Sequence, residues 1–304
     1  AMNMAEAAVI TREQPVLIIL DQMERWPSEN DEAFDQFWRE LLHALPGLRL
    51  LGMGRCGPPF FAQPWLETML APLDEEDALA LLSQALISAG EMPPAADSGR
   101  NTAELFRIAT LAGGSPGALV RLAHEISVSG IAGTLERLRP LRAELLRTYE
   151  DDPQWPHYLG LELAVQRLPL DDRQQLPILA FFREGANRLA LGRALELDTQ
   201  AVQALGERLV ALQLAEDRGH GHLWIDPALS QHLSSHLNST QRTTWRARWR
   251  SGMEYLLQML YQQYFKDNTR TLRLLRLELG NLLALLRDSQ HQSEPERTAQ
   301  LAAR

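Results

Sequence analysis

The sequence predicts a mostly α-helical protein that carries part of a parallel α/β domain near its N-terminus. Two short apolar runs, 15–20 and 48–54, have the composition of parallel β-strands, and a helical pattern separates them. From Asp74 onward, apolar residues recur almost everywhere at helical spacing. One interruption, at 212–225, has the pattern of a β-hairpin around a glycine-rich turn.

Composition limits the class of protein. The 304 residues are 45% apolar and 23% charged, which allows two or three domains with real cores. The formal net charge of -9 disfavours general nucleic-acid binding, although a local basic patch is compatible with it. The single cysteine, Cys56, excludes a disulfide framework and favours a reducing, cytoplasmic compartment. No apolar run reaches the roughly 20 residues that span a bilayer, and Ala1 before Met2 is typical of a cloning remnant.

The first strand, 15–20, stops at Asp21. An unbroken aliphatic run predicts a strand buried on both faces of a parallel sheet, and such sheets bind ligands beyond the carboxyl ends of their strands. Asp21 is therefore expected where a phosphate and its magnesium would lie, and Glu24 could orient a water molecule. The alternative is a core strand that happens to end in a capping aspartate.

The next elements follow from local signals. Residues 30–44 have acids in the first turn and helical apolar spacing, and 48–54 form a second strand that ends at Arg55. Residues 66–73 have an extended pattern. Helices are then expected at 74–89, 101–112, 116–128 and 132–149, the third beginning with the cap-and-proline pair Ser115-Pro116.

The C-terminal half predicts a winged helix followed by long helices. Helices at 157–167, 171–182, 187–195 and 198–212 precede the hairpin, and a further helix, 227–237, follows Asp226-Pro227. Residues 239–266 and 268–287 then form two long helices, which resemble the opening of an α-solenoid.

Four motifs, in order, resemble those of the STAND class of signal-transduction NTPases, of the NB-ARC or bacterial transcriptional-regulator type. Residues 16–24, VLIILDQME, resemble the Walker B strand of the family, and 50–55, LLGMGR, resemble its sensor strand. Residues 70–78, LAPLDEEDA, resemble the entry to its helical lid, and 113–119, GGSPGAL, resemble the motif whose proline packs on adenine. The stretch 277–285, LELGNLLAL, is similar to the start of a family tetratricopeptide array.

The resemblance implies four parts: the C-terminal part of a P-loop NTPase domain, a helical lid, a winged helix and the opening of a TPR-like superhelix. Their expected bounds are 1–73, 74–150, 151–237 and 238–304. It also implies an ATP/ADP-dependent switch that senses a ligand through C-terminal repeats, self-associates on activation and acts through a protein effector or transcriptional output.

The resemblance further assigns roles to six residues. Asp21 would hold magnesium through water, with Glu24 and Arg55 as the other catalytic residues, Arg55 being the γ-phosphate sensor. Gly114 and Pro116 would lie at the nucleotide. Asp226 stands where many relatives have a histidine that touches the bound diphosphate, and an acid there would repel phosphate unless a metal or a base intervened.

The chain departs from the family in one further respect. No Walker A loop, GxxxxGK[ST], occurs in the sequence, and that loop supplies much of the triphosphate affinity. We therefore expect negligible ATP hydrolysis by this chain alone. Either it is the C-terminal part of a larger regulator or the protein is degenerate or split.

Three other interpretations remain open. The missing Walker A loop and Asp226 fit a non-catalytic helical scaffold or adaptor. A winged-helix DNA-binding regulator would use the basic stretch that contains Arg246, Arg248 and Arg250, although the helix 198–212 is a poor reader of DNA. Four histidines could suggest zinc but lack cysteine or acidic companions at ligand spacing, namely His220, His222, His232 and His236.

Overall fold

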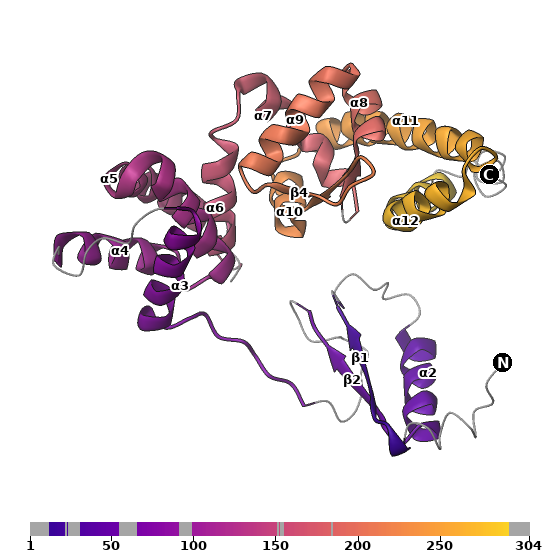
Figure 1. Cartoon of the computed structure of the whole chain (residues 1–304), viewed down its shortest axis with the longest axis horizontal. Helices are drawn as coiled ribbons and strands as arrows, with labels where there is room; N and C mark the ends of the chain where they lie inside the picture. Colours follow the sequence, from indigo (N-terminus) through magenta and orange to yellow (C-terminus); the bar gives the residue numbers. More distant parts are fainter. Residues whose placement is uncertain are drawn as a thin grey trace. The chain divides into compact units, whose positions relative to one another are not determined.

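The protein is described from a computed structural model that covers residues 12–21, 23, 31–54, 66–90, 99–150, 152, 155–183 and 185–291. The chain forms two compact units, Ala1–Ala71 and Pro72–Arg304. As predicted, helices dominate the fold (Figure 1). Within the described ranges, no helix is long and apolar enough to cross a bilayer.

The first unit contains two parallel strands joined through a helix. Strand β1 (Val16–Leu20) pairs with β2 (Leu48–Gly52) in the register Leu20↔Gly52, and α2 (Asp31–Ala44) makes the crossover that parallel strands require (Figure 1). The parallel pairing predicted from the two apolar runs is therefore confirmed.

The prediction that β1 is buried on both faces is wrong for the residues that the structure describes. Val16, Leu17 and Ile19 are 42%, 56% and 54% exposed. Adjacent residues of a strand point to opposite faces, so Val16 and Leu17 show that both faces are open. The two strands and one helix that the structure describes in this unit leave them uncovered. The segment 66–73, predicted to be extended, is in no strand.

The second unit begins with three helices: α3 (Glu75–Ser88), α4 (Gly99–Leu111) and α5 (Pro116–Thr148). Asp74 caps α3 by accepting a hydrogen bond from the Asp77 N–H at 2.9 Å, and the acids of the first turn complement the helix dipole. Gly130, at φ 71°, breaks α5 between the two helices that the sequence predicts there. Ser115 makes no capping hydrogen bond, contrary to expectation.

A small antiparallel sheet with surrounding helices follows. Its strands lie in the order β3-β5-β4, and the predicted hairpin is formed by β4 and β5. Its elements are α6 (Trp155–Val165), α7 (Leu170–Gln175), the 3-10 helix η3 (Leu176–Phe181), β3 (Ala186–Asn187), α8 (Arg188–Leu195), α9 (Thr199–Ala211), β4 (Ala215–Asp217), β5 (His222–Ile225) and α10 (Pro227–Ser235). The single helix expected at 171–182 is instead α7 and η3, because Pro177 cannot donate a backbone hydrogen bond.

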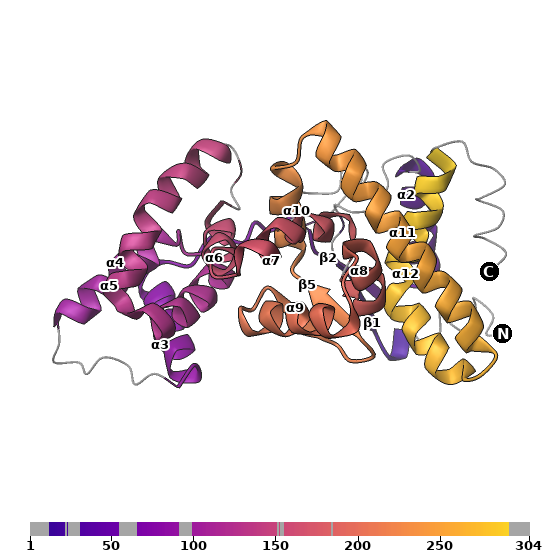
Figure 2. The same cartoon turned by 90° about the horizontal axis from the view of Figure 1, so that it is seen from above.

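Two long helices end the described chain, α11 (Ser239–Tyr264) and α12 (Asn268–His291), and they pack against each other (Figure 2). Asn238 and Gln241 form a capping box that starts α11. Helix α11 also packs closely on α8, where a Cβ at Gly252 would lie 2.4 Å from the Ala190 carbonyl oxygen.

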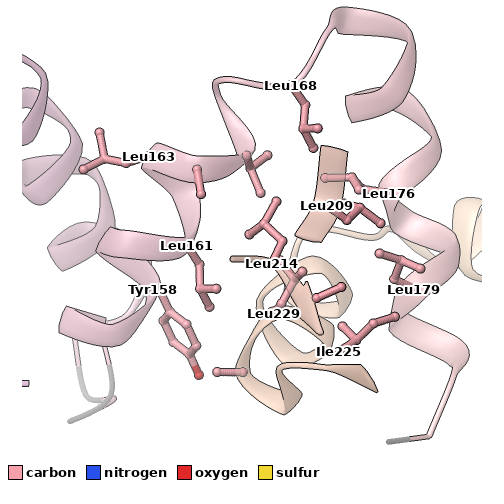
Figure 3. Close-up of a cluster of buried hydrophobic side chains, with 14 of the residues drawn as sticks. Tyr158, Leu161, Leu163, Leu168, Leu176, Leu179, Leu209, Leu214, Ile225 and Leu229 are labelled. Carbon is pink, nitrogen blue, oxygen red and sulfur yellow. The ribbon is translucent and has the colours of Figure 1, made fainter. Parts of the chain in front are cut away.

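One continuous apolar core runs from α3 to α12. Most side chains of helix α6 are buried, because it packs on α5 and on α10 at the same time. Its side chains Tyr158 and Leu161 extend toward the cluster that holds Leu214 and Leu229 (Figure 3). This shared core brings the start of α10 beside α5 and α6.

Candidate functional site

One predicted site residue, Asp21, lies at the carboxyl edge of the β1–β2 pair. Asp21 directly follows β1, and backbone hydrogen bonds continue the pairing on either side of it, from Met53 N to Leu20 O at 2.7 Å and from Met23 N to Met53 O at 3.0 Å. Asp21 therefore sits at the edge where the sequence placed it. Glu24 and Arg55 lie outside the described residues.

The second unit joins two of the motifs that carry the resemblance. The Leu73 N–H donates to the Gly114 carbonyl at 3.0 Å. Gly114 has φ 66°, and a Cβ there would lie 2.3 Å from the Leu73 carbonyl oxygen, so this approach needs glycine. A depression of about 290 Å³ lies here, lined by Leu73, Asp74, Glu75, Ala78, Phe106, Ala109, Thr110, Gly113 and Gly114. It has room for a small ligand, near the lower limit of ligand pockets.

Pro116 takes the first position of α5, as expected, and is exposed. An N1 proline needs no hydrogen-bond partner and has a backbone angle suited to a helix start. Its position is thus explained by the helix, and its exposure leaves it accessible for contact with a ligand.

Asp226 is a further predicted site residue, and the structure places two basic side chains against it. Its Oδ2 forms an ion pair with Arg121 of α5 and accepts from His157 Nε2 of α6 at 3.1 Å. Its Oδ1 accepts from the Ala228 N–H at 2.9 Å and caps α10. Asp226 therefore combines the capping role with a link between three helices. We call Arg121, His157 and Asp226 the latch.

The latch is largely sheltered from water. The side chains of Arg121, His157 and Asp226 are 12%, 24% and 15% exposed. Burial alone raises the pKa of the Asp226 carboxyl. The hydrogen bond and charge of His157, the charge of Arg121 and the Ala228 N–H outweigh it, so this pKa lies well below its usual range. Asp226 is therefore ionised at neutral pH and paired within the chain.

Two glycines make room for the latch. A Cβ at Gly117 would lie 2.5 Å from the His157 ring, and a Cβ at Gly160 would lie 3.1 Å from the Arg121 Cβ. Sequence reasoning missed Arg121 and His157 as site residues. Their signal is three-dimensional, because Arg121 is 105 residues and His157 69 residues from Asp226.

The opposite end of α10 is held by a second polar cluster. His232 contacts the Tyr149 hydroxyl through Nδ1 at 2.8 Å and Glu162 through Nε2 at 3.1 Å. Tyr149 also contacts the Ser235 hydroxyl at 2.6 Å. Burial is the main cause of the raised pKa of Tyr149. Helix α10 is thus fixed to α5 and α6 at its start and near its end.

The histidines do not form a metal centre in the described part of the chain. The Nδ1 atom of His222 lies 2.6 Å from a carboxylate oxygen of Glu278 in α12, and His232 contacts Glu162. No group of three or more His, Cys, Asp or Glu side chains among the described residues is arranged to hold a metal ion. The magnesium role expected for Asp21 stays a prediction.

Similarity to known proteins is found among solved structures and not among protein families or curated proteins. No protein-family model matches the chain, and no curated protein matches it. Among solved structures, the Walker-type ATPase PABY2304 of Pyrococcus abyssi is similar over 75% of this chain, with 17% identity and a TM-score of 0.33. The similarity spans 66% of that protein, slightly less than two thirds of its length.

Proposed function

We propose that this chain is part of a STAND-type signalling switch that responds to ATP or ADP. We assign the first unit to an α/β nucleotide domain, α3–α5 to a helical lid and α6–α10 to a winged helix, the three parts that would together bind nucleotide in the intact protein. Helices α11 and α12 would open the array that senses a ligand. Nucleotide exchange would shift the protein from a closed state to a self-associating one.

One observation carries this proposal: two parallel strands deliver Asp21 to the carboxyl edge of their sheet. Ligands of parallel sheets bind at that edge, and an acidic residue there is suited to magnesium and phosphate. The contact of Leu73 with Gly114 adds support, because it joins the predicted lid entry to the predicted adenine motif.

Thermal unfolding of the chain, titrated with Mg-ADP and Mg-ATP to millimolar concentration, tests the proposal. A ligand at 100 times its dissociation constant adds roughly 2.7 kcal/mol of stability. We expect a saturable rise in Tm that Asp21→Asn abolishes and that Asp171→Asn, the same change at an exposed residue of α7, preserves. Absence of any rise would reject nucleotide binding by this chain.

A non-catalytic scaffold is the second candidate, and the latch favours it. Asp226 pairs with Arg121 and His157 of the same chain, so side chains alone can link α10 to α5 and α6. This candidate predicts no nucleotide-dependent rise in Tm.

The described surfaces give DNA binding little support. The only arginine of α9, Arg208, pairs with Asp172, while Arg246 and Arg250 both pair with Asp288. These pairs reduce the positive charge available to phosphates. No shift of duplex DNA in a gel at low salt would reject the DNA-binding interpretation.

A further inference from the structure

The latch places two donor side chains against a single carboxylate oxygen. Arg121 and His157 both contact Oδ2 of Asp226, whereas Oδ1 is used by the start of its own helix. The carboxylate of Asp226 therefore accepts hydrogen bonds from a guanidinium, from an imidazole and from the first turn of α10. An anion with three or four oxygens could give each of the two side chains an acceptor of its own.

Arg121 also has unused capacity to donate. A guanidinium carries five N–H donors in a planar fork. One terminal nitrogen faces Asp226, and the other donates to the Gly117 carbonyl at 3.3 Å. The Nε atom is buried and has no hydrogen-bond partner in the structure. A buried donor without an acceptor is costly, so the site favours a ligand that brings more acceptor atoms.

From these contacts we propose that Arg121 and His157 form a binding site for a phosphate group, which Asp226 occupies as a built-in competitor. The carboxylate and the phosphate have the same sign of charge and use the same two donors, so they bind in turn and not together. That the phosphate belongs to a nucleotide rests on the proposed function. The phosphate site itself does not, because free phosphate offers the same chemistry.

This competition couples the ligand to the position of α10. Asp226 caps α10, so its release from Arg121 and His157 frees the start of that helix from α5 and α6. Contacts of Tyr149 and Glu162 with His232 still hold the helix farther along. The start of α10 is therefore either attached to the latch through Asp226 or released from it. Phosphate favours the released form because it binds Arg121 and His157 only when Asp226 does not.

Asp226→Asn is the decisive variant, because asparagine keeps the size and the capping oxygen and removes the competing charge. Calorimetric titration with inorganic phosphate, at constant ionic strength set with chloride, measures the affinity. We expect Asp226→Asn to bind phosphate at least about tenfold more tightly than the wild type. Adding Arg121→Gln to it should abolish the gain. Equal affinities of wild type and Asp226→Asn would overturn the proposal.

A second measurement needs no variant and so does not depend on how Asp226→Asn folds. Hydrogen exchange of the wild-type chain is compared in saturating phosphate and in chloride of the same ionic strength. We expect faster exchange at the start of α10, at 228–230, in phosphate, with α9 unchanged as an internal control. Unchanged exchange throughout α10 would count against displacement of Asp226.

Competition with ADP distinguishes a nucleotide from free phosphate as the ligand of the latch. It also distinguishes the phosphate site from the proposed nucleotide switch. In Asp226→Asn, displacement of phosphate by ADP would identify the nucleotide as the carrier, and phosphate binding without displacement would identify free phosphate. Phosphate binding that Arg121→Gln removes and Asp21→Asn leaves intact supports the latch site even if nucleotide binding fails. An ADP-induced rise in Tm that depends on Asp21, without phosphate binding at the latch, would support the proposed function and reject the phosphate site.

Discussion

Replacing Glu278 by alanine should detach α12 from the small sheet. Glu278 is fully buried, as is Asn281 one turn later. Its carboxylate contacts His222 Nδ1 at 2.6 Å and accepts from the Asn281 amide at 2.9 Å. Asn281 in turn donates to the Gly185 carbonyl and accepts from the Arg183 N–H. The change therefore removes the centre of a buried polar network.

The expected loss of stability follows from the buried polar groups that Glu278→Ala leaves without a partner. Each buried polar group that loses its partner costs about 1–3 kcal/mol, and Glu278→Ala leaves two of them, on His222 and Asn281. We expect a loss of about 2–6 kcal/mol for Glu278→Ala. At roughly 2–4 °C per kcal/mol for a unit of this size, Tm should fall by about 4–24 °C.

Urea unfolding of wild type and variant measures this loss, and hydrogen exchange locates it. Exchange should accelerate in α12 and β5 before it does in α3. Arg276→Ala, at an exposed position of the same helix, is the matched control and should cost no more than about 0.5 kcal/mol. A loss below about 1 kcal/mol for Glu278→Ala would refute the claim that this network docks α12.

Three further predictions concern the latch and its surroundings. Gly114→Ala should cost at least about 1–3 kcal/mol more in urea unfolding than Gly130→Ala, because both have positive φ but only Gly114 has a neighbour, Leu73, in the way; equal costs would contradict this. Asp226 has a lowered pKa, so its stabilisation is full above about pH 4 and is lost as the pH falls further. The stability of Asp226→Asn should depend less on pH below that value, and an unchanged pH profile would argue against the latch. Tyr149 has a raised pKa, so its contribution is lost as the pH rises above about 10. Tyr149→Phe should flatten the alkaline slope of Tm, and an unaltered slope would rule out this role.

Most elements could be predicted from the sequence because their signals are local. The acids and cap at Asp74 mark the start of α3, and Gly130 marks the break in α5. The hairpin of β4 and β5 follows from a glycine-rich turn between alternating residues. Strand β3 was missed because two residues, 186–187, carry no periodic pattern.

Burial and the candidate site depend on distant parts of the chain, so the sequence predicts them less well. The aliphatic run of β1 was expected to be buried on both faces, yet Leu17 is more than half exposed, because burial depends on the neighbouring layers. Asp226 was identified at its position by resemblance, but its partners Arg121 and His157 were not. The buried pair of His222 and Glu278 is 56 residues apart and has no sequence signal either.

Equilibrium dialysis of the wild-type chain against labelled Mg-ADP tests the central claim most directly. The proposed switch predicts saturable binding of one ADP per chain in the millimolar range, competed by Mg-ATP and lost in Asp21→Asn. It also predicts no measurable ATP turnover, since the sequence contains no Walker A loop. Absence of saturable binding, or binding that is indifferent to Asp21, would contradict a nucleotide switch and leave the scaffold as the better account.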